Sequence, residues 1–214
     1  MHGKLLKSDL FGAVWQAEDH GRTLVVRDAR SARIGLRPLA RWLLRREAAA
    51  LARLDGLAGV PRLVDADRDM LRREWIEGRP MQAARPRHDG YFRAARRLVA
   101  AMHRRGVAHC DLAKEPNWLM TPTGGPALVD FQLAWVAPRR GRMFRMLARE
   151  DLRHLLKHKR TYCPDRLSAR ERAILARPGA ASRLWMATVK PVYLFVTRRL
   201  LGWADREGAG DRRF

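Results

Sequence analysis

The chain has 214 residues, of which 47% are hydrophobic, so it can bury the core of one large domain or of two small lobes, and global disorder is disfavoured. Its two cysteines, Cys110 and Cys163, are too few for a disulfide framework and are not spaced as zinc ligands, which favours a reducing, cytosolic compartment. The formal net charge of +22 comes from 44 basic residues, of which six are lysine. It reflects either a coding preference for arginine or an anionic partner such as nucleic acid, lipid or lipopolysaccharide.

The first third of the chain is predicted to form strands around one helix. Leu10–Gln16 and Thr23–Arg27 are short, mostly apolar runs on either side of turn residues, which predicts a β-hairpin. A helix is expected over Pro38–Leu54, where a proline suits the first turn. A second pair of strands is expected at Arg62–Ala66 and Met70–Ile76.

The remainder of the chain is predicted to be mainly helical, with one further hairpin. The pattern over Tyr91–Arg105 is that of an amphipathic helix. Short strands are expected at Asn117–Met120 and Ala127–Val129, joined by a glycine-containing turn. Another helix is expected to open at Asp151, because an acidic residue suits the positive end of the helix dipole.

The order of these elements indicates the fold class. Strands come first and helices afterwards, which favours an α+β chain with two lobes rather than a doubly wound sheet. Glu77–Pro80 contains the residues of a chain break, so we place the boundary there. The expected lobes cover residues 1–78 and 79–214.

Three polar residues of the second hairpin form the clearest candidate site. Asn117 begins one strand, Asp130 follows the other, and Asp111 lies just upstream. Because the start of one antiparallel strand lies beside the end of its partner, these side chains should converge. Two carboxylates and an amide oxygen provide the hard oxygen donors that Mg²⁺ prefers, while a further carboxylate can accept a hydroxyl proton.

The same segments resemble a known enzyme family. Residues 107–112 (VAHCDL) through Asn117, followed by residues 129–134 (VDFQLA), resemble the catalytic loop and the metal-binding loop of protein-kinase-like enzymes. The resemblance covers most of residues 8–135 and is closer to small RIO-type and lipopolysaccharide-kinase-type members than to large eukaryotic kinases. It implies a two-lobed kinase fold, with Asp111 as catalytic base and with Asn117 and Asp130 as Mg²⁺ ligands.

The resemblance also implies a cation paired with a glutamate near the phosphates of ATP. The chain has no lysine between Lys7 and Lys114, so the candidate cation is Arg27, with Lys7 as a second possibility. Glu47 lies on the apolar face of the expected helix, where a carboxylate needs a partner. We expect it to pair with Arg27, the alternative being a surface pair with another arginine.

Other nucleotide-binding elements are less complete. Gly12 and Val14 resemble the end of a glycine-rich loop, although one glycine in a hairpin is also typical of an ordinary turn. Glu74 lies in a segment that resembles the hinge that receives adenine. Lys114 either contacts the transferred phosphoryl group or is simply solvated. Cys110 stands where such enzymes usually have arginine and is expected to be a buried thiol rather than a nucleophile.

The C-terminal third offers weaker signals. His154 and His158 are spaced as metal ligands, but with no third ligand they are expected to be surface histidines. Leu184–Trp203 is interrupted by charges and a proline, so it is not a membrane span. This segment either packs on the core as a helix or docks to a membrane surface or to a partner protein. Met1–Leu10 lacks the apolar core of a signal peptide.

The sequence therefore predicts an ATP-dependent phosphotransferase that uses Mg²⁺ and acts on a hydroxyl group, most simply Ser or Thr of a protein. One alternative is a kinase for a lipopolysaccharide sugar or another envelope acceptor, cytoplasmic but peripheral on the inner membrane face. Another is a pseudokinase that binds or scaffolds, because Arg27 and the single Gly12 depart from the family pattern. A nucleic-acid binder is the weakest alternative, since charge is its only support.

Overall fold

The computed structural model describes residues 3–176, and its largest β-structure is an antiparallel sheet of five strands in the order β1-β2-β3-β5-β4. The tight turn at His20 and Gly21 joins β2 to β3 in the predicted first hairpin. The edge strand β1 was not predicted, because it is almost wholly exposed and lacks the alternation of a half-buried strand. The strands are β1 (Gly3–Asp9), β2 (Gly12–Asp19), β3 (Arg22–Asp28), β4 (Leu63–Ala66) and β5 (Met70–Glu74).

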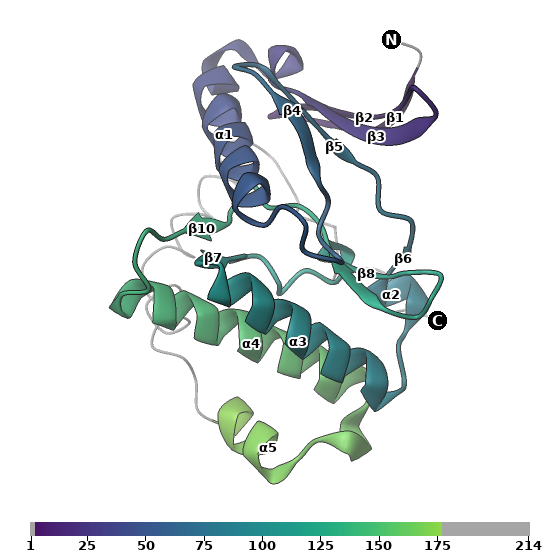
Figure 1. Cartoon of the computed structure of the whole chain (residues 1–214), viewed down its shortest axis with the longest axis vertical. Coiled ribbons are helices and arrows are strands. Elements are labelled where there is room, and N and C mark those ends of the chain that lie inside the picture. The colour runs from purple at the N-terminus through teal and green to yellow at the C-terminus, as the bar shows by residue number, and fades with distance from the viewer. Residues whose placement is uncertain (1–2, 177–214) are drawn as a thin grey trace, which may run out of the picture.

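One long helix, α1 (Arg37–Arg53), contacts this sheet, as Figure 1 shows. It follows two short 3₁₀ turns, η1 (Ala29–Ser31) and η2 (Ile34–Leu36). A proline in the first turn helps to start the helix, and the predicted range is confirmed to within one residue. Its inner face is apolar apart from one carboxylate; the buried residues are Ala40, Leu43, Leu44, Glu47, Ala50 and Leu51.

Two further long helices, α3 (Asp89–Arg104) and α4 (Arg142–Tyr162), lie side by side below the sheet in Figure 1. The predicted start of the second at Asp151 is wrong, since α4 begins nine residues earlier, at Arg142. The prediction assumed that Asp151 interacts with the helix dipole at the first turn, whereas Asp151 is buried in the middle of the helix. Shorter helical elements are α2 (Met81–Ala84), η3 (Glu115–Asn117), η4 (Pro164–Arg166) and α5 (Ala169–Ala176).

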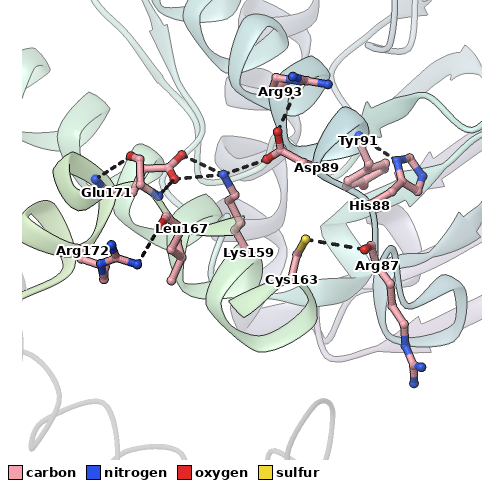
Figure 2. Close-up of polar contacts among 11 residues, drawn as sticks. Arg87, His88, Asp89, Tyr91, Arg93, Lys159, Cys163, Leu167, Glu171 and Arg172 are labelled. Atoms are coloured by element: carbon pink, nitrogen blue, oxygen red, sulfur yellow. Dashed lines mark hydrogen bonds and ion pairs between the residues drawn. The ribbon is translucent and has the colours of Figure 1, made fainter. Parts of the chain in front are cut away.

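A buried lysine joins α5 to the two long helices. Lys159 Nζ lies 2.9 Å from Asp89 Oδ1 and 2.9 Å from Glu171 Oε2, as drawn in Figure 2. Ser168 and Glu171 exchange hydrogen bonds at the start of α5 in a capping box. The last described helix is therefore attached through charge, and it buries no residue of its own.

Short strands hold the loops between α3 and α4. The predicted hairpin is present as β8 (Trp118–Met120) and β9 (Pro126–Leu128), and β6 (Arg79–Pro80) adds to it. A separate pair, β7 (Val107–Ala108) and β10 (Trp135–Val136), brings the segment before Asp111 beside the segment after Asp130. These two small sheets therefore fix both ends of the candidate site.

The main core lies between α3, the β8–β9 hairpin and the end of α1. Trp118 is completely buried in it, and its Nε1 donates to the carbonyl of Leu112 at 3.1 Å, so the one polar atom of the ring is satisfied. Phe131, just after Asp130, is also completely buried. The core thus anchors the residues that flank the candidate site.

The fold is of the α+β class, as predicted, with an antiparallel sheet of five strands and several helices. Within residues 3–176, no helix is both long enough and apolar enough to span a membrane. The segment Leu184–Trp203, expected to pack on the core or to lie on a membrane, falls outside the described residues.

Candidate active site

A buried cluster of charges links the sheet to α1. Arg27 on β3 lies with Nε 2.9 Å from Glu47 Oε2, and Nε of Arg73 on β5 lies 3.3 Å from the other oxygen of Glu47. The expected pairing of Arg27 with Glu47 is therefore confirmed, and the surface alternative is excluded because Glu47 is 0% exposed. Nothing in the sequence pointed to Arg73, which reaches Glu47 from β5, 26 residues further along the chain.

Arg27 also reaches the second hairpin. Its Nη2 donates to Oδ1 of Asp130 at 3.0 Å, so one guanidinium bridges two carboxylates. Burial works against the charge, but the attraction of Glu47 and Asp130 outweighs it and raises the pKa of Arg27. Burial likewise opposes the ionised form of Asp130, yet Arg27 and neighbouring cations hold the pKa of Asp130 below its ordinary value. Both groups are charged at neutral pH.

Asp111 and Asn117 are held together at the start of the hairpin. The amide Nδ2 of Asn117 donates to the backbone carbonyl of Asp111 at 2.9 Å and to its Oδ2 at 3.1 Å. Lys114 Nζ lies 3.1 Å from the same Oδ2. Burial is the main cause that raises the pKa of Asp111, and the charge of Asp130 adds to it, while Lys114 opposes it. This carboxylate is therefore more basic than an ordinary aspartate.

The loop before Asp111 is positioned by a residue that the sequence did not single out for this purpose. The carboxylate of Asp151, 0% exposed in the middle of α4, accepts hydrogen bonds from the backbone N–H of His109 at 2.8 Å and of Cys110 at 3.0 Å. His103 Nε2 lies 3.0 Å from the same group. Asp151 lies four residues before the buried Leu155, on the same inner face of the helix. This spacing could have indicated a buried carboxylate that needs partners.

The backbone on either side of the site is strained. Cys110 has φ 64° and Asp130 has φ 65°, in the left-handed region that residues other than glycine seldom adopt. Such conformations persist where surrounding contacts enforce them, and here these contacts are the bonds of Asp151 to the loop and of Arg27 to Asp130. His109 supports both segments, because its Nε2 donates to the carbonyl of Val129 at 3.0 Å.

A cavity of about 80 Å³ opens beside Arg27 and Asp130. Gly12 lies at the turn above it with φ 125°, and a Cβ there would come within 2.2 Å of the carbonyl oxygen of Asp28, so only glycine fits. The pairing of β1 with β2 is irregular between Leu5 and Lys7. The residues around the cavity that bear on its chemistry are Lys7, Asp9, Gly12, Val14, Arg27 and Asp130.

The structure thus brings most of the predicted residues to one region. Gly12, Val14, Arg27 and Asp130 line one cavity, and Lys7, the second candidate cation, lines it too. Glu74 does not belong to that lining: it ends β5 opposite Leu24 of β3.

Two expectations about other titratable residues can be compared with the structure. His158 is not a surface histidine: it is buried in α4 and its Nε2 donates to the carbonyl of Leu112 at 2.8 Å. Burial lowers the pKa of His154 to about 4, so that ring is neutral. Cys110, expected to be buried, is half-buried, and the burial of its thiol raises the pKa to about 12.

The donor set fits a Mg²⁺ ion only when a further ligand is bound. Asn117 uses its amide nitrogen within the loop and thereby leaves Oδ1 as an oxygen donor, and Asp130 supplies a carboxylate. No group of three His, Cys, Asp or Glu side chains that could hold a metal exists within residues 3–176. One or two protein oxygens completed by phosphate and water is the coordination that Mg²⁺ favours at nucleotide sites.

Comparison of the chain with models of known protein families finds no match, and comparison with curated proteins finds no significant relative. The functional assignment therefore depends on the geometry of the chain itself.

Proposed function

We propose that the protein is an ATP-dependent phosphotransferase of the protein-kinase-like class, with an N-terminal lobe over residues 1–78 and a C-terminal lobe over residues 79–214. The observation that carries the proposal is the double contact of Arg27, which joins Glu47 of α1 to Asp130 of the loop after β9 at 2.9 and 3.0 Å. Asp130 lies 103 residues after Arg27 in the sequence. A cation paired with a helix glutamate, beside the aspartate that would hold Mg²⁺, is the arrangement that positions nucleotide phosphates in this class.

Asp111 is assigned the role of accepting the proton of the attacking hydroxyl. Its raised basicity suits that role, and the two bonds from Asn117 fix its orientation. Lys114, whose Nζ lies 3.1 Å from the carboxylate, is assigned to contact with the transferred phosphoryl group. Proton transfer from a positioned base contributes about 10²–10⁴-fold to a rate, and removing this carboxylate should cost about that much.

Asn117 and Asp130 would hold Mg²⁺ together with the phosphates of ATP. When bound, the ion neutralises charge on the phosphate oxygens. Gly12 and Val14 let the backbone of the β1–β2 turn approach the phosphates closely, and the segment around Glu74 is assigned to the adenine side.

The acceptor is proposed to be a Ser or Thr hydroxyl of a protein, and a lipopolysaccharide-type sugar is the alternative acceptor. The two cysteines are free thiols, which supports a cytoplasmic location where ATP is plentiful.

Nucleotide binding is tested first, by thermal shift with Mg²⁺–ATP. The wild type should be stabilised and Asp130→Ala should respond much less, because it loses the ligand oxygens. Mg²⁺ alone should give little shift, since the protein offers too few ligands by itself. If ATP with Mg²⁺ leaves the wild type unshifted, the proposal fails.

Transfer is then tested with radiolabelled ATP against a cell lysate and against purified lipopolysaccharide. Asp111→Asn should bind ATP normally but transfer phosphate about 10²–10⁴-fold more slowly. Asp65→Asn is the matched control, since Asp65 forms only an exposed pair with Arg72. Unchanged transfer in Asp111→Asn would remove Asp111 from its assigned role.

A binding module without transfer is the second candidate. It is favoured by one contact: Arg27 occupies an oxygen of Asp130 that the metal would need. Stabilisation by ATP without label transfer to any acceptor class, in the wild type, would support this candidate over the enzyme.

A further inference from the structure

A second surface, distinct from the cavity beside Arg27, combines arginine with exposed apolar side chains. It extends from the turn before β10, through β10 and the loop after it, to the first turn of α4, and we call it the Arg–Trp surface. Its residues are Leu133, Trp135, Arg139, Arg140, Arg142 and Met143. In Figure 1 the end of α1, β10 and the start of α4 follow one another along one side of the molecule.

The charge of this surface is one-sided. Residues 131–149 contain five arginines and no acidic residue. Arg139, Arg140 and Arg142 are exposed, and none of them forms an ion pair with a carboxylate of the described residues. Their charges are therefore not neutralised locally, unlike that of Arg27, and they are available to an anionic partner.

The apolar side chains of the surface are exposed and lie close together in the sequence. Leu133 is 43%, Trp135 42% and Met143 54% accessible, and all three lie within the same short stretch. Leucine and methionine cannot hydrogen-bond, so their grouping with arginines is not explained by contact with a soluble anion. Apolar and tryptophan side chains flanked by arginine are typical of segments that lie at the surface of a bilayer.

The backbone that carries these side chains is held firmly. Arg46 of α1 donates to the carbonyls of Leu133 at 3.1 Å and Ala134 at 2.8 Å. Trp135 pairs with Ala108 across β10 and β7, and Phe144 is buried against Ala108 at the start of α4. The surface is thus presented in a fixed shape, which lowers the entropic cost of binding.

We propose that the Arg–Trp surface binds the headgroup region of an anionic phospholipid bilayer, with Leu133, Trp135 and Met143 inserted among the acyl chains. This binding does not depend on the proposed phosphotransfer. If both hold, the acceptor hydroxyl meets Asp111 at a membrane surface, because β7, paired with β10, leads directly into the loop that carries Asp111.

The test uses the full chain and sedimentation with vesicles. Vesicles of phosphatidylcholine with phosphatidylglycerol should bind the protein, and pure phosphatidylcholine vesicles should bind it far less. The triple variant Arg139→Gln/Arg140→Gln/Arg142→Gln should bind the anionic vesicles on the order of 100-fold more weakly at low salt, since each basic residue near such a surface contributes about fivefold.

A charge-matched control separates this surface from the overall positive charge. Arg22→Gln/Arg68→Gln/Arg97→Gln removes the same three charges from exposed arginines elsewhere and should stay within about threefold of the wild type. An equal loss in both triple variants would show that net charge alone attracts the lipid, and would overturn the proposal.

The apolar component has its own test. Trp135→Ser/Met143→Ser should lose the part of vesicle binding that persists at high salt, where charge attraction is screened. Unchanged binding of this variant at high salt would overturn the proposed insertion. Single-stranded RNA is the competing polyanion: an Arg–Trp surface that binds RNA but no anionic vesicle would also overturn the proposal. Thermal denaturation of each variant confirms that it is folded.

Discussion

Glu47 and Asp151 are both completely buried carboxylates, yet their surroundings differ in kind. Glu47 meets two guanidinium groups, those of Arg27 and Arg73. Asp151 meets two backbone N–H groups of the loop before Asp111 and one histidine ring. The first region is held by full charges and the second mainly by backbone dipoles.

The difference indicates what each region can do. Arg27 shares its bonds between two carboxylates, Glu47 and Asp130. It can therefore exchange one of these bonds for a bond to a charged ligand. A carboxylate that accepts backbone bonds cannot change partners without unfolding the loop, so it serves to fix geometry. The bonds of Arg27, beside the cavity, can thus be rearranged, whereas the loop before Asp111 is fixed in place.

Removing the fixed carboxylate should have the largest effect on stability. Asp151→Leu leaves two buried N–H groups and His103 without an acceptor, and should lower the free energy of unfolding by about 3–5 kcal/mol. Asp151→Asn keeps one acceptor oxygen and should lose clearly less. Urea denaturation measures both. A loss below about 1 kcal/mol in Asp151→Leu would show that the loop does not depend on this carboxylate.

Neutralising the other carboxylate should cost less and should be partly reversible. Glu47→Gln leaves Arg27 and Arg73 facing a neutral side chain, and should lower the free energy of unfolding by about 2–3 kcal/mol. Adding Arg73→Met removes one uncompensated charge, so the double variant should recover part of the loss. Additive losses in a double-mutant cycle would contradict the view that the two residues stabilise each other.

Replacing Lys7 should have a smaller effect than either of these changes. Lys7 lines the same cavity, with Nζ 3.6 Å from Asp9 Oδ2, and we expect it to share phosphate binding with Arg27. Lys7→Ala should weaken Mg²⁺–ATP binding about tenfold. Lys4→Ala, an exposed change on the same strand, is the control. Calorimetric titration that gives equal affinities for the two variants would assign the phosphates to Arg27 alone.

The smallest effect should come from the charges that hold α5. Hydrogen bonds from Lys159 help to lower the pKa of Asp89, and although burial opposes it, bonds from Ser168 and Lys159 lower the pKa of Glu171. A depressed carboxyl pKa gives stability that is present above the unfolded pKa and is lost as the pH falls through the folded value. Below about pH 4 the wild type should lose stability more steeply than Lys159→Met, by roughly 1–2 °C in Tm. Parallel pH profiles would contradict this.

The sequence sufficed for the elements with a clear period. The helix α1 was predicted to within one residue because its apolar face repeats regularly and a proline marks its start. The β8–β9 hairpin was predicted because a glycine turn separates two short apolar runs. The strand β1 was missed, because an exposed edge strand does not show the alternation that burial imposes.

The candidate site shows the same limit. The pairing of Glu47 with Arg27 was predictable, because a carboxylate on an apolar helix face demands a partner. Arg73 and Asp151 were not assigned to the site, since each reaches it through a contact between segments distant in sequence. Asp151 is also a carboxylate on the inner face of a helix, as Glu47 is. Its burial was overlooked because an aspartate also suits the start of a helix.

The presence of arginine at position 27 has a practical consequence for labelling the protein. ATP analogues that transfer an acyl group to amines report on lysines near bound nucleotide, and a guanidinium, protonated at all working pH values, does not accept the acyl group. The chain has no lysine between Lys7 and Lys114. If the proposed nucleotide site holds, such a reagent would pass over residue 27, and a survey that scores only a lysine of the third strand would not detect this chain.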